Sequence, residues 1–123
     1  YCLEVLNTKV DHPGYSINYI EDAVRLVKEV NSPYVKVLCD IYHSAVEEGN
    51  VVQLLREYHP YIGHIHVADL PGRHEPGTGE LNYRFVAQAL REIGYKGIVG
   101  MEAYPLTDSH QAMESFRAAF SGA

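Results

Sequence analysis

The sequence alternates four times between a short stretch rich in β-branched residues and a longer stretch in which apolar residues recur at helical spacing. The predicted strands span residues 1–5, 35–40, 62–67 and 98–102, and the predicted helices span residues 18–30, 46–58, 82–93 and 109–120. A strand followed by a helix of this length, repeated along the chain, is typical of right-handed βαβ units that form a parallel sheet. The chain is therefore predicted to be an α/β protein.

Ordinary capping signals set the predicted helix ends. Asn18, with Glu21 three residues later, predicts a capping box at the start of the first helix. Gly94 ends the third helix. The last helix is expected to be capped by Asp108 or Ser109.

Two architectures fit this order of elements. One is an open, doubly wound sheet, and the other is a parallel (βα)4 half of a TIM-type (β/α)8 barrel, whose full length is typically about 250 residues. The length of 123 residues favours the first architecture, whereas the polar residues at the strand ends favour the second. No linker divides residues 1–123, so a single unit is expected. Because the chain opens at Tyr1 directly in a strand, we expect it to be a piece of something longer.

Composition and charge limit the kinds of molecule that this chain can bind and the compartment in which it is expected. The chain has 10 Lys+Arg against 16 Asp+Glu, a formal charge of -6, which disfavours a nucleic-acid partner because phosphates are bound by Lys and Arg. No apolar stretch is long enough to span a membrane. Cys2 and Cys39 lie in apolar stretches and are expected to be reduced, buried thiols. A cytoplasmic protein with a small-molecule substrate is the resulting expectation.

Each predicted strand carries a side chain that can bind metal at or near its end: Glu4, Asp40, His66 and Glu102. The carboxyl ends of parallel strands meet at one rim, where active sites of parallel α/β folds are built, so we expect these side chains to gather there. Three carboxylates and one imidazole suit a divalent metal ion, with Mg or Mn favoured and Zn or Co as alternatives. Taken singly, an acidic residue at a strand end is more often solvated or caps a helix. The prediction rests on all four positions together.

Two further residues, His64 and His43, are singled out by their positions. His64 and His66 are separated by one residue on a strand and therefore point to the same side. We assign a structural role to His64 and the functional role to His66, which lies nearer the rim. His43 follows the second strand, where it is expected to reach a substrate oxygen. The alternative for His43 is a polar loop residue.

The segment 69–80 is long and rich in Gly, Pro and charged residues. Arg73 offers a planar pair of donors for a carboxylate or for two hydroxyls. The segment matches neither the Walker A nor the dinucleotide pattern, so nucleotide binding is weakly supported. The alternative interpretation is a flexible surface loop that carries an Arg by chance.

Residues 39–43, 63–80 and 100–102 together resemble hydroxypyruvate isomerases. These belong to the xylose isomerase-like barrel superfamily, which also contains ketose 3-epimerases and apurinic endonucleases. The resemblance covers essentially the whole chain but only strands five to eight of the barrel. It implies that the metal ligands are Glu4, Asp40, His66 and Glu102. It also implies that Glu4 and Glu102 form the acid/base pair and that His43 and Arg73 contact the substrate.

The implied activity is a metal-dependent isomerisation of hydroxypyruvate to tartronate semialdehyde by enediolate proton transfer. The third ligand position can be Gln in the isomerases, whereas His66 matches the epimerase branch, so a ketose 3-epimerase is one alternative. An apurinic endonuclease is disfavoured by the acidic charge and by the lack of further His, Asp and Glu positions for a multi-zinc cluster. A non-catalytic half-barrel fragment is the alternative from another class.

A half barrel would leave two sheet edges unpaired, at residues 1–5 and 98–102. It would also leave the inward faces of the strands bare, and we expect these faces to carry Val35, Val37, Ile62 and Val99. Closure of the sheet removes such edges. We therefore expect a homodimer or association with a missing amino-terminal half.

Overall fold

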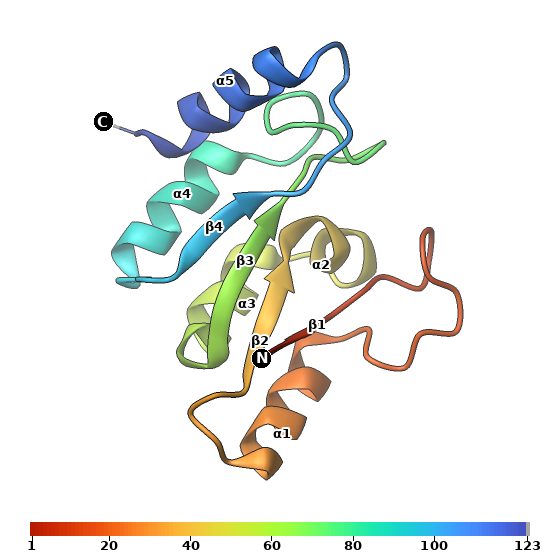
Figure 1. Ribbon diagram of the computed structural model, residues 1–123, viewed down its shortest axis with the longest axis vertical. Helices are drawn as coiled ribbons and strands as arrows, with labels where there is room; N and C mark the ends of the chain where they lie inside the picture. Colours follow the sequence, from red (N-terminus) through yellow and green to blue (C-terminus); the bar gives the residue numbers. More distant parts are fainter. Residues whose placement is uncertain (123) are drawn as a thin grey trace.

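The computed structural model describes residues 1–122 and contains one sheet of four parallel strands in the order β1-β2-β3-β4 (Figure 1). The strands are β1 (Cys2–Glu4), β2 (Lys36–Asp40), β3 (Ile62–Val67) and β4 (Ile98–Met101). The helices are α1 (Ile20–Val30), α2 (Ile41–Glu47), α3 (Val51–Tyr58), α4 (Tyr83–Glu92) and α5 (Ser109–Phe120), with a short 3-10 helix, η1 (His59–Tyr61). Strands that follow one another in sequence are neighbours in the sheet, and the predicted α/β class is confirmed.

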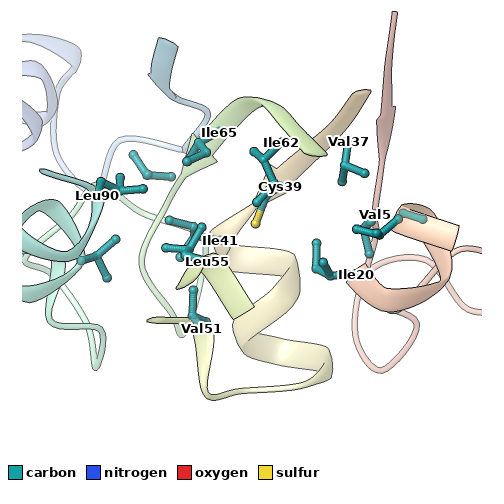
Figure 2. Packing of buried hydrophobic residues seen from close by; sticks show 14 of the residues in the cluster. Val5, Ile20, Val37, Cys39, Ile41, Val51, Leu55, Ile62, Ile65 and Leu90 are labelled. Carbon is teal, nitrogen blue, oxygen red and sulfur yellow. The ribbon is translucent and has the colours of Figure 1, made fainter. Parts of the chain in front are cut away.

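The apolar core lies between one face of the sheet and the helices. Figure 2 shows side chains from β2, β3 and the helices converging there, among them Ile20, Val37, Cys39, Ile41, Leu55 and Ile65, all of them 0% exposed. The alternate residues of β2 and β3 point away from this core and are mostly only half-buried. A sheet covered on one face, with its strands in sequential order, is half of a barrel rather than a doubly wound sheet with helices on both faces.

A bulge in β3 affects which of its residues face the open side of the sheet, the face that the helices do not cover. The register between β2 and β3 shifts just before Leu38, which pairs with His64, and Gly63 is the extra residue. A Cβ atom on Gly63 would lie 2.7 Å from the Cβ atom of Lys36, closer than two such atoms can pack. Glycine therefore permits the bulge, and beyond it His64 and His66 face the open side.

The expectation that Val35, Val37, Ile62 and Val99 line the open face is wrong. Val37 and Ile62 are 0% and 6% exposed in the core, and Val35 and Val99 pack against that core at its margin. The alternation of a strand separates its two faces but does not say which face the helices cover. The register instead places a largely polar set on the open face: Glu4, Lys36, Leu38, His64, His66 and Ile98.

The predicted helix over residues 46–58 is two helices, α2 and α3. Gly49 and Asn50, which lie between them, have φ angles of 73° and 50°, and this left-handed backbone ends the first helix. Helix α2 begins directly after β2 because the Asp40 side chain accepts a hydrogen bond from the backbone N–H of His43. His43 therefore lies in the first turn of a helix and not in a loop.

The capping box predicted at Asn18 and Glu21 is wrong. Helix α1 begins at Ile20 and has no side-chain cap of its own. A distant residue takes that role, since the Glu48 carboxylate accepts a hydrogen bond from the backbone N–H of Ile20 at 2.9 Å. The prediction for the last helix is confirmed, because the Asp108 side chain caps α5.

Both cysteines are free thiols. Cys39 is buried, as expected, but Cys2 is exposed because β1 is an edge strand of the sheet. Among the helices of residues 1–122, none combines the length and the apolar character needed to cross a membrane.

Candidate active site

Glu4, Asp40, His66 and Glu102 come together at the carboxyl end of the sheet. Each offers one ligand atom, and these atoms lie within 4.8 Å of one another. Nδ1 of His66 is 3.9 Å from Oε1 of Glu4, 3.8 Å from Oδ2 of Asp40 and 3.3 Å from Oε2 of Glu102. Glu102 directly follows β4, and its backbone N–H donates to the carbonyl of Val67 at 3.1 Å. The structure thus brings together the four residues that the sequence suggested.

This donor set fits a hard divalent cation. Nδ1 of His66 is buried, and it has no hydrogen-bond partner among residues 1–122, although it faces three carboxylates. Buried polar atoms are nearly always paired, so an orphan atom of this kind calls for a partner. Carboxylate oxygens and one imidazole nitrogen suit Mg or Mn, and Zn is compatible with them as well.

The electrostatics of the cluster also favour a cation. Burial raises the pKa of Asp40 to about 6, although the charge of Arg73 opposes this rise. Burial, followed by the negative charge of Glu102, raises the pKa of Glu4 above its ordinary value. Ionising these carboxyls together is costly, and a positive charge among them offsets the cost.

Arg73 supplies one positive charge to this cluster. Its Nη2 atom donates to Oδ2 of Asp40 at 2.8 Å and to Oε2 of Glu102 at 2.6 Å. The guanidinium also lies over the ring of Tyr42, 5.0 Å from its centroid. Gly72 and Arg73 have φ angles of 94° and 60°, a left-handed turn at the base of this side chain. Arg73, which the resemblance predicts to contact the substrate, thus lies in the site, bound to two of the candidate ligands.

The segment 69–80 that carries Arg73 is tightly organised. Asp69 is 0% exposed, and its carboxylate accepts hydrogen bonds from the backbone N–H groups of Leu70, Gly77 and Leu81. Glu75 is 2% exposed and accepts from the backbone N–H of Leu106, which ties the segment to the connection between β4 and α5. The interpretation as a flexible loop with a chance Arg is therefore wrong.

His43 lies beside the cluster, and its side chain is 0% exposed. Its Nε2 atom is 4.0 Å from Oδ2 of Asp40 and has no hydrogen-bond partner in the described part of the chain. Burial, assisted by the charge of Arg73, lowers the pKa of His43 to about 4, so the imidazole is neutral near pH 7. A neutral imidazole carries one N–H, which can donate to an oxygen atom.

Asn7, Asp11 and Tyr42 also belong to the site, although the sequence did not predict them. Asn7 is 0% exposed, and its Nδ2 atom lies 2.7 Å from Nδ1 of His43. The hydroxyl of Tyr42 donates to Oδ2 of Asp11 at 2.8 Å. These partners are 36 and 31 residues apart in sequence, so no local pattern links them. The position of Asn7 shortly after the first predicted strand is the one signal that could have drawn attention to it.

Comparison with known families decides where this fold belongs. A family described as xylose isomerase-like TIM barrel matches residues 1–119. The chain belongs to this family. The resemblance inferred from residues 39–43, 63–80 and 100–102 is thereby confirmed.

Relatives of this chain with assigned names include two isomerases. The 2-oxo-tetronate isomerase of Cupriavidus necator is 41% identical over 103 residues, which cover 84% of this chain and 39% of that protein. The hydroxypyruvate isomerase of Escherichia coli is 34% identical over 103 residues, which cover 84% of this chain and 40% of that protein. The chain thus spans about two fifths of the length of the relatives it matches.

Solved structures share the arrangement of strands and helices seen in this chain. An AP endonuclease of family 2 from Brucella melitensis has a TM-score of 0.87 and 38% identity, covering 94% of this chain and 44% of that one. D-psicose 3-epimerase from Clostridium cellulolyticum H10 has a TM-score of 0.79 and 30% identity, covering 98% of this chain and 46% of that one. Both comparisons place this chain on part of a TIM barrel.

Proposed function

We propose that this chain supplies the metal-binding half of an isomerase that converts hydroxypyruvate to tartronate semialdehyde. The observation that carries the proposal is the set of three carboxylates around the unpartnered Nδ1 atom of His66. The names of two relatives support the substrate class, since hydroxypyruvate and 2-oxo-tetronate are both 2-oxo acids with a hydroxyl group on the neighbouring carbon. A divalent cation held by this set would stabilise the negative charge that develops on the substrate oxygens.

Glu4 and Glu102 are proposed as the acid/base pair. They approach the cluster from β1 and from the end of β4, the two outer strands of the sheet, and their carboxylate oxygens lie 3.9 Å and 3.3 Å from Nδ1 of His66. One carboxylate removes a proton from the hydroxyl-bearing carbon, and a proton is returned to the former carbonyl carbon. The hydroxyl proton also passes to the former carbonyl oxygen, so that the three transfers together give an aldehyde and a new hydroxyl group with no change in composition.

His43 and Arg73 are proposed to orient the substrate. The unpartnered Nε2 atom of His43 borders the carboxylate cluster and can donate to a substrate oxygen. Arg73 adds a positive charge beside Asp40 and Glu102, which favours an anionic substrate at the same rim. Both side chains are largely buried, so they hold fixed positions there.

A ketose 3-epimerase is the second candidate function. It is supported by His66 at the third ligand position and by the similarity to D-psicose 3-epimerase. Such an enzyme uses the same acids but returns the proton to the other face of the same carbon. An endonuclease is less well supported, because the chain has a net charge of -6 and because residues 1–122 form one cluster of metal-ligating side chains.

An assay with two substrates distinguishes these functions. We expect the full gene product, supplied with Mg²⁺ or Mn²⁺, to convert hydroxypyruvate to tartronate semialdehyde and to leave D-fructose unchanged. Product formation is followed by nuclear magnetic resonance. Epimerisation of D-fructose without turnover of hydroxypyruvate would contradict the proposed substrate, and inactivity toward both compounds would contradict the proposed enzyme class.

We also propose that the chain acts in the cytoplasm and that its sheet associates with a second copy or with a separate amino-terminal half barrel. Strands β1 and β4 each pair with only one neighbour in the described sheet, and unpaired strand edges favour association. On the open face Ile98 is 69% exposed, and burying such a side chain contributes about 1.5–3 kcal/mol. Sedimentation equilibrium of this chain at low micromolar concentration should therefore give a mass above the monomer's, and a well-folded monomer would contradict the proposal.

A further inference from the structure

We propose that Asn7 is a positioning residue that holds His43 in the tautomer with its proton on Nε2, so that this N–H faces the carboxylate cluster. The consequence for substrate binding rests on the proposed function, whereas the tautomer itself does not. Asn7 is 0% exposed, follows β1 and reaches His43 on α2 across 36 residues of sequence.

The contacts of His43 Nδ1 determine where the proton lies. The backbone N–H of Asn7 donates to this atom at 3.2 Å, and the Nδ2 atom of Asn7 lies 2.7 Å from it. Both groups on Asn7 are donors and neither can accept a hydrogen bond. Nδ1 of His43 must therefore present its lone pair, and in a neutral imidazole the proton is then on Nε2.

The orientation of the Asn7 amide is itself fixed by three further contacts. Its Oδ1 atom accepts from the backbone N–H groups of Val10 and Asp11, both at 3.0 Å. Its Nδ2 atom also donates to Oδ2 of Asp11 at 2.7 Å. A flipped amide would set its NH₂ group against two backbone donors and its oxygen against a carboxylate. The Asp11 carboxylate is held in turn by the hydroxyl of Tyr42 at 2.8 Å.

The Nε2 atom, on the opposite side of the His43 ring, indicates that a ligand binds there. Nε2 of His43 belongs to a fully buried side chain, lacks a hydrogen-bond partner among residues 1–122 and lies 4.0 Å from Oδ2 of Asp40. Leaving a buried donor unpaired is unfavourable, so a group that binds at the cluster is expected to accept from it. An oxygen atom of a small hydroxycarbonyl compound has the required chemistry.

The test is the tautomer of His43, measured by long-range ¹H–¹⁵N correlation on the ¹⁵N-histidine-labelled chain, with the His43 signal assigned from His43→Gln. In the wild type we expect one protonated nitrogen, Nε2, and one unprotonated nitrogen, Nδ1. A wild-type signal with the proton on Nδ1, or with both tautomers populated equally, would overturn the inference. The tautomer itself is measured on the wild type, and the variant serves only to assign the His43 signal.

Asn7→Asp keeps an oxygen for the backbone N–H groups of Val10 and Asp11 but replaces the NH₂ donor by an acceptor. We expect the proton of His43 to move to Nδ1 in this variant. Thr8→Val is the matched control, because it removes the hydroxyl contacts of the neighbouring residue with Glu47 and leaves His43 untouched. The backbone N–H of residue 7 is kept in this variant, so an unchanged Nε2–H tautomer in a folded Asn7→Asp variant would contradict the role of the Asn7 side chain.

Kinetics of the full gene product separate this inference from the proposed function. Removing one preorganised donor from an active site typically costs about 10²–10³ in kcat, so we expect Asn7→Asp to lower kcat by about tenfold or more while Thr8→Val does not. An Nε2–H tautomer together with no turnover of hydroxypyruvate would contradict the proposed function alone. Turnover together with an Nδ1–H tautomer would contradict the inference about Asn7 alone.

Discussion

Replacing Asp40 with Asn is expected to lower the affinity of this chain for Mn²⁺ by at least about 100-fold, because changing even a group that only orients a metal ligand costs about 10- to 100-fold. Asp40 is 0% exposed, and its Oδ2 atom lies 3.8 Å from Nδ1 of His66. The substitution removes one negative charge and keeps the size of the side chain. Isothermal titration calorimetry with Mn²⁺ measures the affinity, and circular dichroism checks the fold.

The two histidines of β3 provide a matched control for this prediction. His64 and His66 face the same side of the strand with their ring centroids 4.9 Å apart, but only His66 belongs to the candidate ligand set. We expect His66→Ala, which leaves no ligand atom at this position, to abolish Mn²⁺ binding and His64→Ala to leave it unchanged. Wild-type affinity in Asp40→Asn and His66→Ala alike would show that the metal is bound elsewhere.

The alternation of strand and helix could be predicted because it depends on the local periodicity of apolar residues along the sequence. The last helix begins at Ser109 after the Asp108 cap, as the sequence indicates. Likewise, the four candidate ligands could be predicted because parallel strands end at one rim, which makes the position of a residue along its strand sufficient to place it. Neither argument needs information about distant contacts.

The failures of the sequence predictions come from contacts between distant residues. Asn18 has the chemistry of a cap, but the carboxylate of Glu48, 28 residues from Ile20, holds the start of α1 instead. The covered face of the sheet could not be assigned, because the alternation of residues in a strand has no direction. Asn7 was missed because its function depends on His43, which only the folded chain brings beside it.

Proton exchange gives the strongest test of the acid/base pair. In the full gene product, we expect Glu102→Gln and Glu4→Gln to slow the exchange of the carbon-bound hydrogens of hydroxypyruvate with deuterated water by about 10²–10⁴-fold, the usual contribution of a positioned acid or base. Glutamine keeps an oxygen that can accept from Nη2 of Arg73, so Glu102→Gln retains that contact in the site. Mass spectrometry of the recovered substrate measures the exchange.

These glutamates are also candidate metal ligands, so weakened metal binding alone could slow the exchange. Comparison with Asp40→Asn at saturating Mn²⁺ separates the two effects, because Asp40 belongs to the ligand set but is not assigned a proton transfer. When excess Mn²⁺ restores occupancy, Asp40→Asn should recover exchange, while Glu102→Gln and Glu4→Gln should remain slow. Recovery in all three variants would reduce both glutamates to metal ligands and would require a base other than the three carboxylates of this cluster, Glu4, Asp40 and Glu102.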